Sequence, residues 1–172
     1  MKNTRKTLKI LLSALVAAST LLTLFSCKDN KDKKYTVGIC QLVKHDALDA
    51  ATKGFKDALV AELGEGNVEF IEQNGQNDIN VCSTVINDFV TKRVDLILAN
   101  ATAPLQAAAN TTLTIPILGT SITEYGTALS IKDFNGTVGG NISGTSDLAP
   151  LDKQAAMIPE LFPEAKSVAL LY

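Results

Sequence analysis

The sequence predicts an α/β fold, a parallel sheet of strand order 2-1-3-4-5 with helices on both faces. The first observation behind this prediction is that short apolar runs alternate with longer segments whose apolar residues recur every three or four positions. The second is that polar loops and helix-capping residues separate the two kinds of segment. Strands and helices that alternate at this spacing form right-handed βαβ units, which build a parallel sheet.

The unit at 94–110 shows this pattern most clearly. Asp95–Ala99 has the length and apolar character of a strand buried on both faces. A polar turn at Asn100–Ala103 leads into a helix with Pro104 at its first position, where the missing N–H of proline would have had no partner. The free N–H groups and the positive dipole end of this helix therefore face whatever lies at the carboxyl end of the strand.

The remaining elements follow in order. Apolar runs of strand length cover Tyr35–Val43, Asn67–Gln73, Asp95–Ala99, Ile115–Gly119 and Val138–Ile142. Segments of helical periodicity cover about 46–63, 79–91, 104–110, 125–129 and 147–162. Asp46 or a neighbour is expected to cap the first helix, and Gly64 to end it. The second helix is expected to bury Ile79 and Phe89, while Pro159 is expected to end or kink the last helix.

Composition excludes several classes of function. With 46% hydrophobic and 20% charged residues among 172, the chain has an ordinary globular composition. A net charge of −2 and the absence of a clustered basic face argue against a nucleic-acid partner. The single histidine, His45, has no nucleophile motif beside it and is expected to start a helix or to touch the edge of a cleft. Because no catalytic, metal-binding or phosphate-binding motif is present, we expect neither an enzyme nor a cofactor or metal.

The first 27 residues have the pattern of a targeting segment. Basic residues precede the apolar run Ile10–Phe25, which is too short for a comfortable membrane span. The run ends at Leu24-Phe25-Ser26-Cys27, which resembles a bacterial lipobox with Cys27 as the lipidated residue. An ordinary signal peptide in which Cys27 is incidental is the alternative. Residues 28–34 are a charged tether.

Two further cysteines lie in the predicted fold. Cys40 ends an apolar strand and Cys82 lies on the apolar face of a helix, so both are expected to be buried free thiols. A disulfide between them is the alternative, because an extracytoplasmic compartment permits it.

In this strand order the topological switch point lies between strands one and three, where ligands bind at the carboxyl ends of strands. The loops that meet there carry amides, hydroxyls and small residues with few charges; they are Gln41–Asp46, Asn74–Asp78, Asn100–Ala103 and Thr120–Glu124. This character is typical of a binding surface rather than of acid–base catalysis.

Several segments in order resemble one family, the substrate-binding lipoproteins of bacterial ABC importers in the tryptophan/tyrosine-type branch. They are YTVGICQLVKHDALDAATKGFKDAL, VDLILANATAPLQAAAN, IPILGTSI, GGNISGTSDL and AKSVALLY, and together they span nearly all of Tyr35–Tyr172. The resemblance implies a type I periplasmic-binding-protein fold, with two lobes and a ligand in the cleft between them. Residues 35–146 are then the N-terminal lobe, and 147–172 are the crossover and the start of a second lobe. Lys166–Tyr172 is expected to begin a buried strand of that lobe, so the chain is expected to be an N-terminal fragment.

An amino-acid ligand needs donors for its carboxylate and an acceptor for its ammonium group. The helix starts at Thr102-Ala103 and Ser121-Ile122 are candidates for the first role, and Asp147 for the second. Gln41 and Asn77 are expected to line the wall beside them, and a solvated loop residue is the alternative for Gln41. Simple helix capping is the alternative for Thr102, Ser121 and Asp147.

The resemblance implies a solute-binding protein anchored by lipid outside the cytoplasmic membrane, which delivers a small, amino-acid-like molecule to an ABC permease. The other hypothesis is a tethered single lobe that serves as a sensory or partner-binding module without transport.

Overall fold

The computed structural model describes residues 34–169. The predicted signal peptide, Cys27 and nearly all of the charged tether lie outside the described residues. Within this range, no helix is long and apolar enough to cross a membrane.

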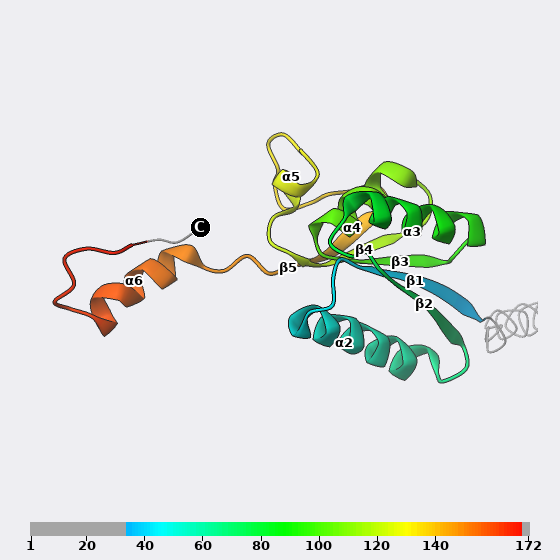
Figure 1. Cartoon of the computed structure of the whole chain (residues 1–172), viewed down its shortest axis with the longest axis horizontal. Coiled ribbons are helices and arrows are strands. Elements are labelled where there is room, and N and C mark those ends of the chain that lie inside the picture. The colour runs from blue at the N-terminus through cyan, green and yellow to red at the C-terminus, as the bar shows by residue number, and fades with distance from the viewer. Residues whose placement is uncertain (1–33, 170–172) are drawn as a thin grey trace, which may run out of the picture. The chain divides into compact units, whose positions relative to one another are not determined.

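A five-stranded parallel sheet organises the described residues (Figure 1). Its strands are β1 (Tyr35–Gln41), β2 (Val68–Asn74), β3 (Leu96–Asn100), β4 (Ile117–Ile122) and β5 (Ile142–Ser146). Every neighbouring pair is parallel and the spatial order is β2-β1-β3-β4-β5, so the predicted fold class and strand order are confirmed.

The helices begin and end where local chemistry favours it. They are α2 (Asp46–Leu63), α3 (Ile79–Lys92), α4 (Thr102–Thr111), α5 (Tyr125–Ala128) and α6 (Leu151–Leu161). His45 caps α2, because its Nδ1 accepts a hydrogen bond from the Ala47 N–H at 3.2 Å. Gly64, with a φ of 90°, ends the same helix. Asp78 caps α3 by accepting from the Asn80 N–H at 2.7 Å.

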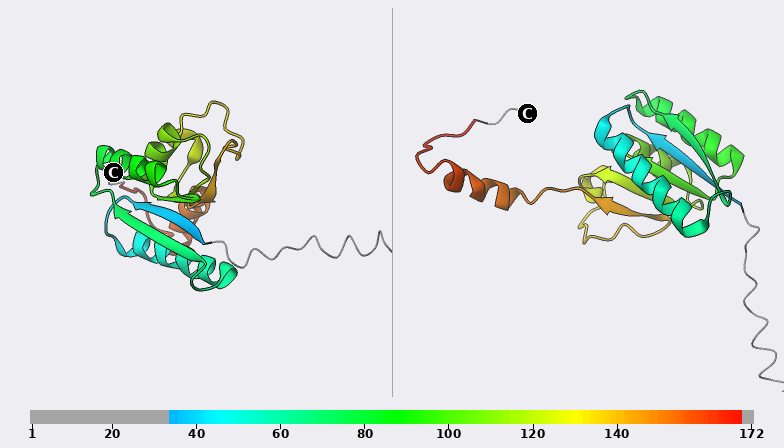
Figure 2. Two further views of the ribbon diagram at one scale, coloured as in Figure 1. Left: turned by 90° about the vertical axis from the view of Figure 1, so that its right-hand side faces the viewer. Right: turned by 90° about the horizontal axis from the view of Figure 1, so that it is seen from below.

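The helices cover the sheet unequally: α3 and α4 lie on one face and α2 lies on the other (Figures 1 and 2). Along β1 the side chains alternate between these faces. Cys40 joins the cluster under α3 and α4, whereas Val37 and Ile39 pack toward Phe55 and Leu59 of α2.

Both described cysteines are buried free thiols, as predicted. Burial raises the pKa of Cys40 far above its ordinary range, and the neighbouring Cys82 adds to this effect. The pKa of Cys82 is raised as well, again chiefly by burial.

Two strand positions differ from the prediction. The fifth strand begins at Ile142, where the predicted Val138–Ile142 ends, because Gly139 and Gly140 take φ values of 79° and 62° that do not continue a strand. The fourth strand continues three residues beyond Gly119, through Ile122, since Thr120 pairs with Asn100 of β3 and Ile122 pairs with Ser146 of β5.

Several helix details also differ. Pro104 is the third residue of α4 rather than its first. Ile79 is 44% exposed because it begins α3 at the rim of the sheet, so its predicted burial is wrong. Pro150 precedes α6, and Pro159 lies within it two residues before its end.

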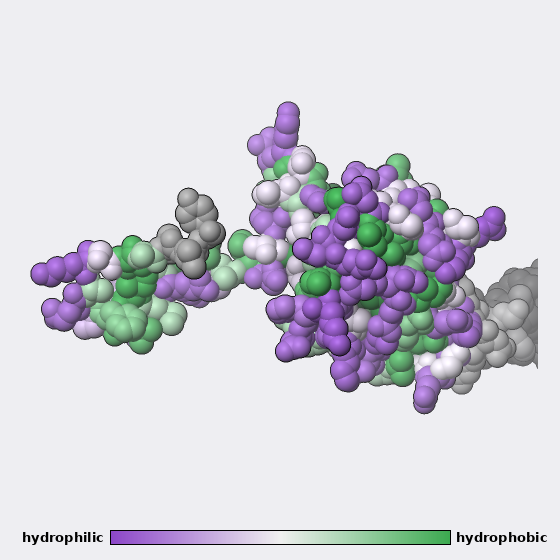
Figure 3. Space-filling view, viewed as in Figure 1, coloured by the Kyte–Doolittle hydropathy of each residue, from purple (hydrophilic) through white to green (hydrophobic). Residues whose placement is uncertain are grey.

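The segment after β5 buries little of its apolar surface. α6 has no buried residue, and large hydrophobic side chains are exposed on it at Leu151, Met157 and Leu161 and directly after it at Phe162 (Figure 3). Residues 166–169 form no strand, although a strand was predicted to begin there. A strand needs a hydrogen-bonded neighbour, and within the described residues these four have none.

Candidate functional site

The carboxyl ends of β1 to β4 bring the first residues of all four predicted loops to one edge of the sheet. Gln41 of β1 is in register with Asn74 of β2 and with Asn100 of β3, which in turn is in register with Thr120 of β4. These four polar side chains form a row at the edge where ligands of open α/β sheets bind.

The start of α4 is the most open group of donors at this edge. Its N-cap residue, Ala101, makes no side-chain hydrogen bond and has a φ of 95°, a value rarely adopted by a residue with a Cβ. The helices α2, α3 and α5 instead have side-chain caps. Because Pro104 has no N–H, the donors left at the first turn of α4 are the N–H groups of Thr102 and Ala103 and the exposed Thr102 hydroxyl.

Asp147 follows β5 and lies beside the end of β4. Its N–H donates to the carbonyl of Ile122 at 3.0 Å, and the residue is exposed. Two strand spacings separate the ends of β3 and β5, which is about 10 Å. The structure therefore places Thr102, Ala103 and Asp147 along the same edge of the sheet.

The prediction of a helix start at Ser121-Ile122 is wrong. Both residues belong to β4, and α5 starts at Tyr125. The Glu124 carboxylate occupies the helix start by accepting from the N–H groups of Thr127 and Gly126. The Thr127 side chain, followed by these two N–H groups, holds the pKa of Glu124 below its ordinary value. Ser121 remains at the edge, half-buried and with a φ of 56°.

Asn77 lies on the turn between β2 and α3. Its backbone has a φ of 58°, a conformation that asparagine tolerates better than most residues, and its N–H donates to the Leu42 carbonyl at 2.9 Å. The side chain is exposed. Asn77 thus reaches the carboxyl edge, next to the end of β1.

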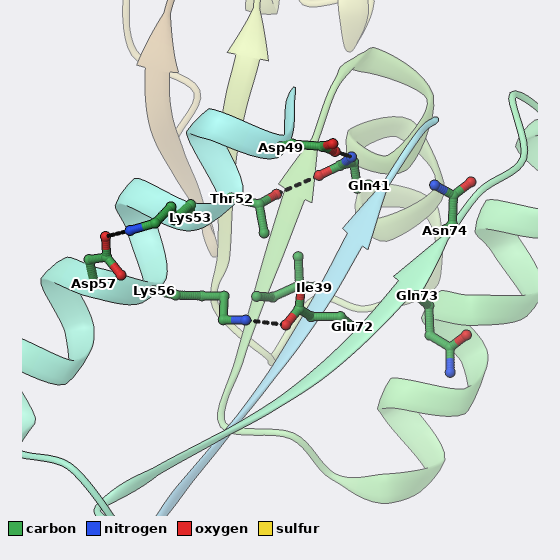
Figure 4. A pocket seen from close by; sticks show the side chains of 10 residues that line it. All are labelled: Ile39, Gln41, Asp49, Thr52, Lys53, Lys56, Asp57, Glu72, Gln73 and Asn74. Atoms are coloured by element: carbon green, nitrogen blue, oxygen red, sulfur yellow. Dashed lines mark hydrogen bonds and ion pairs between the residues drawn. The ribbon is translucent and has the colours of Figure 1, made fainter. Parts of the chain in front are cut away.

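Gln41 is engaged within the lobe (Figure 4). Its amide nitrogen donates to Asp49 at 2.6 Å and to the Val43 carbonyl at 2.9 Å, and its oxygen accepts from the Thr52 hydroxyl at 2.7 Å. Both N–H donors of the side chain are therefore used. The bonds join the end of β1 to the start of α2.

Asn100 completes this group, which we call the Gln41 network: Gln41, Asp49, Thr52 and Asn100. The Asn100 amide nitrogen donates to the Leu48 carbonyl at 2.8 Å and to the Thr52 hydroxyl at 2.9 Å. Asn100 is fully buried, and its side-chain oxygen accepts no hydrogen bond from the described residues. From the sequence, Asn100 was predicted only as a loop residue. Its signal was a polar residue directly after a buried apolar run.

A hollow of about 540 Å³ opens between α2, β1 and β2 beside the Gln41 network. Lys53, Lys56 and Glu72 line its outer part, and Gln41 is the one predicted site residue among its lining (Figure 4). The other predicted site residues lie on the open edge rather than in this hollow. The described residues contain no group of three or more side chains that could hold a metal ion.

Comparisons with known proteins match this part of the chain. A family model described as "ABC transporter substrate binding protein" matches residues 36–172. A curated protein named "Tyrosine-binding protein", from Clostridioides difficile strain R20291, is 39% identical over 147 residues, which are 84% of this chain and 42% of that protein.

Two solved structures agree with this match. One is the ligand-free, open form of a substrate binding protein with adhesive properties from Clostridium difficile, with 38% identity, a TM-score of 0.68, and coverage of 77% of this chain and 45% of that one. The other is the ABC domain from Streptococcus pneumonia in complex with L-Trp, with 30% identity, a TM-score of 0.69, and coverage of 76% and 44%. The chain thus spans less than half the length of each of these relatives.

Proposed function

The chain belongs to the family of ABC transporter substrate binding proteins, and from this premise we propose that it binds an amino acid with an aromatic side chain and delivers it to an ABC permease in the membrane. Relatives named as a tyrosine-binding protein and as a complex with L-Trp support this ligand class. They are substrate-binding proteins, in line with the expectation that this chain is not an enzyme. Since less than half of each relative is matched, the proposal concerns the contacts that this lobe makes with the ligand.

The uncapped first turn of α4 is the observation that carries the proposal. The N–H groups of Thr102 and Ala103 and the positive end of the helix dipole form a ready site for the ligand's carboxylate. Asp147, at the end of β5 and so about two strand spacings from the end of β3, accepts from the ammonium group through its carboxylate. A carboxylate and an ammonium on one carbon, with a hydrogen bond on each side, span about 8–9 Å, and the Asp147 side chain can make up the remainder of a backbone separation of about 10 Å.

We further propose that Cys27 is lipidated and holds the protein outside the cytoplasmic membrane. Replacing Cys27 with serine would remove the thiol that carries the lipid. We expect wild-type protein in the membrane fraction and the Cys27→Ser variant in the soluble extracytoplasmic fraction. Equal distribution of both would contradict lipid anchoring, and would leave the ligand proposal intact.

Isothermal titration with a panel of amino acids tests the ligand proposal. We expect heat of binding with tyrosine or tryptophan and weaker binding of small or charged amino acids. If folded protein gives no heat of binding with any amino acid in the panel, the proposal is contradicted.

The Thr102→Asp variant tests the carboxylate site. Aspartate at a helix start stabilises the helix, so the fold is retained, but its charge repels the ligand's carboxylate. We expect affinity to fall by at least about 100-fold. Asn110→Asp makes the same charge change near the other end of α4 and is the matched control. Equal affinity in both variants would remove the start of α4 from the site.

A further inference from the structure

A buried tyrosine hydroxyl joins the last two strands. Tyr125, the first residue of α5, is 6% exposed. Its hydroxyl lies 3.0 Å from the Gly119 carbonyl of β4 and 3.2 Å from the Thr145 carbonyl of β5. A phenol has one hydrogen to donate, so the two carbonyls share it.

Two glycines make room for this hydroxyl. Gly119 and Gly144 are in register across β4 and β5. A Cβ added at Gly119 would lie 2.4 Å from the Tyr125 hydroxyl oxygen, and one added at Gly144 would lie 2.2 Å from it. Any larger residue at either position would displace the phenol. The lack of a side chain at Gly119 and at Gly144 therefore leaves the space that the Tyr125 hydroxyl occupies.

The hydroxyl meets β5 where the pairing of the strands shifts. After the Gly119–Gly144 pair, the next pair is Ile122 with Ser146, so Thr120 and Ser121 together lie opposite Thr145. Such a bulge interrupts the ladder and leaves backbone groups without their regular partners. The Tyr125 hydroxyl supplies a donor to Thr145 at this interruption.

Beyond the bulge, exposed bonds hold the chain beside β4. The Asp147 N–H donates to the Ile122 carbonyl at 3.0 Å, and the Ser146 hydroxyl donates to the Thr123 carbonyl at 2.8 Å. The charge of Asp147 is close enough to Tyr125 to add to the rise in the tyrosine's pKa that burial chiefly causes. Asp147 is therefore close enough to interact electrostatically with the Tyr125 hydroxyl, which hydrogen-bonds to β5 at the bulge.

We infer that Tyr125 is a positioning residue, whose hydroxyl fixes the point at which β5 leaves the sheet and so holds Asp147 at the ligand edge. The hydroxyl contacts the Gly119 carbonyl of β4 and the Thr145 carbonyl of β5 at once. Moving the end of β5 away from β4 therefore deprives the Thr145 carbonyl of its donor, and this cost opposes the movement. The role for Asp147 in ligand binding rests on the proposed function; the fastening of β5 does not.

Amide hydrogen exchange, measured without ligand, tests whether the Tyr125 hydroxyl holds the end of β5 beside β4. Tyr125→Phe removes only the hydroxyl, and we expect the amides of Asp147 and Leu148 to exchange about tenfold faster. The amides of Ile97 and Ala99, in the central strand, should keep their wild-type rates, which also verifies folding. Tyr35→Phe makes the same chemical change at the start of β1 and should leave Asp147 unaffected. Unchanged exchange of Asp147 in Tyr125→Phe would overturn the inference.

A second test separates this inference from the proposed function. The Tyr125→Phe variant should bind L-tyrosine about five- to tenfold more weakly, because the ammonium acceptor is less well held. Its affinity for 3-(4-hydroxyphenyl)propionate, which lacks the ammonium group, should equal that of the wild type. Equal losses for both ligands would contradict the link to Asp147. If wild-type protein binds neither ligand, the proposed function fails, and the exchange experiment alone then decides whether Tyr125 fastens β5.

Discussion

The two faces of the sheet are packed by different means. Under α3 and α4, fifteen buried residues of the described chain form one apolar cluster, whereas under α2 only Val37, Ile39 and Leu98 do so. The large apolar residues of α2 are half-buried, and its one buried residue is Thr52. Hydrogen bonds from the Gln41 network hold the start of α2 where apolar contacts are few. The comparison indicates that apolar packing under α3 and α4 stabilises the lobe, while polar bonds position α2.

The largest expected effect comes from the apolar face. Phe89 of α3 is fully buried against Gly38, and replacing it with alanine should lower the free energy of unfolding by about 3–5 kcal/mol. Phe55→Ala makes the same change on the half-buried face of α2 and should cost about 1–2 kcal/mol. Urea unfolding measures both. Equal losses would show that the two faces contribute alike.

The polar face is tested by Thr52→Val, which keeps the shape of the side chain and removes its hydroxyl. Bonds to Gln41 and Asn100 are lost inside the lobe, so we expect a cost of about 1–2 kcal/mol and faster exchange of amides at the start of α2. Thr84→Val removes an exposed hydroxyl from α3 and should change stability by less than about 0.5 kcal/mol. If the two variants lose equal stability, the network does not hold α2.

A smaller effect concerns the thiols beneath α3. The pKa values of Cys40 and Cys82 are raised in the folded protein, so the unfolded chain releases these protons first as the pH rises. The free energy of unfolding should therefore fall above about pH 9, near the ordinary thiol pKa, and be unaffected by these groups below it. Unfolding measured from pH 7 to pH 10.5 should show a weaker decline in the Cys40→Ala/Cys82→Ala double variant. If the free energy of unfolding falls equally with pH in the wild type and in the double variant, the two thiols do not cause the decline.

Much of the fold follows from periodicity, because the buried parallel strands β1, β3 and β4 are apolar runs that stand out from polar loops, and the edge strand β2 still carries Val68, Phe70 and Ile71. β5 was misplaced because Val138 and Ile142 give a strand-like pattern, while positive φ values at Gly139 and Gly140 break it. Local sequence contains no signal for that backbone geometry beyond the glycines themselves.

The positions of candidate site residues at the sheet edge could be predicted where they follow from the ends of strands. The hydrogen bonds that depend on helix packing could not. Thr102, Ala103 and Asp147 reach the predicted edge because they directly follow strands β3 and β5. The bonds of Gln41 to Thr52 and Asn100 depend on how α2 packs against the sheet, which spacing alone does not determine. α5 starts at Tyr125, as its periodicity predicted, but Ser121 and Ile122 lie in a strand rather than at a helix start because β4 is longer than its apolar run.

The central claim is that the first turn of α4 binds the carboxylate of an aromatic amino acid. The most direct measurement follows the backbone amide signals of isotope-labelled protein by NMR during titration with L-tyrosine. We predict that the Thr102 and Ala103 amides show some of the largest shifts and saturate together, because their N–H groups gain a charged acceptor. Binding that leaves both amides unmoved would contradict the claim.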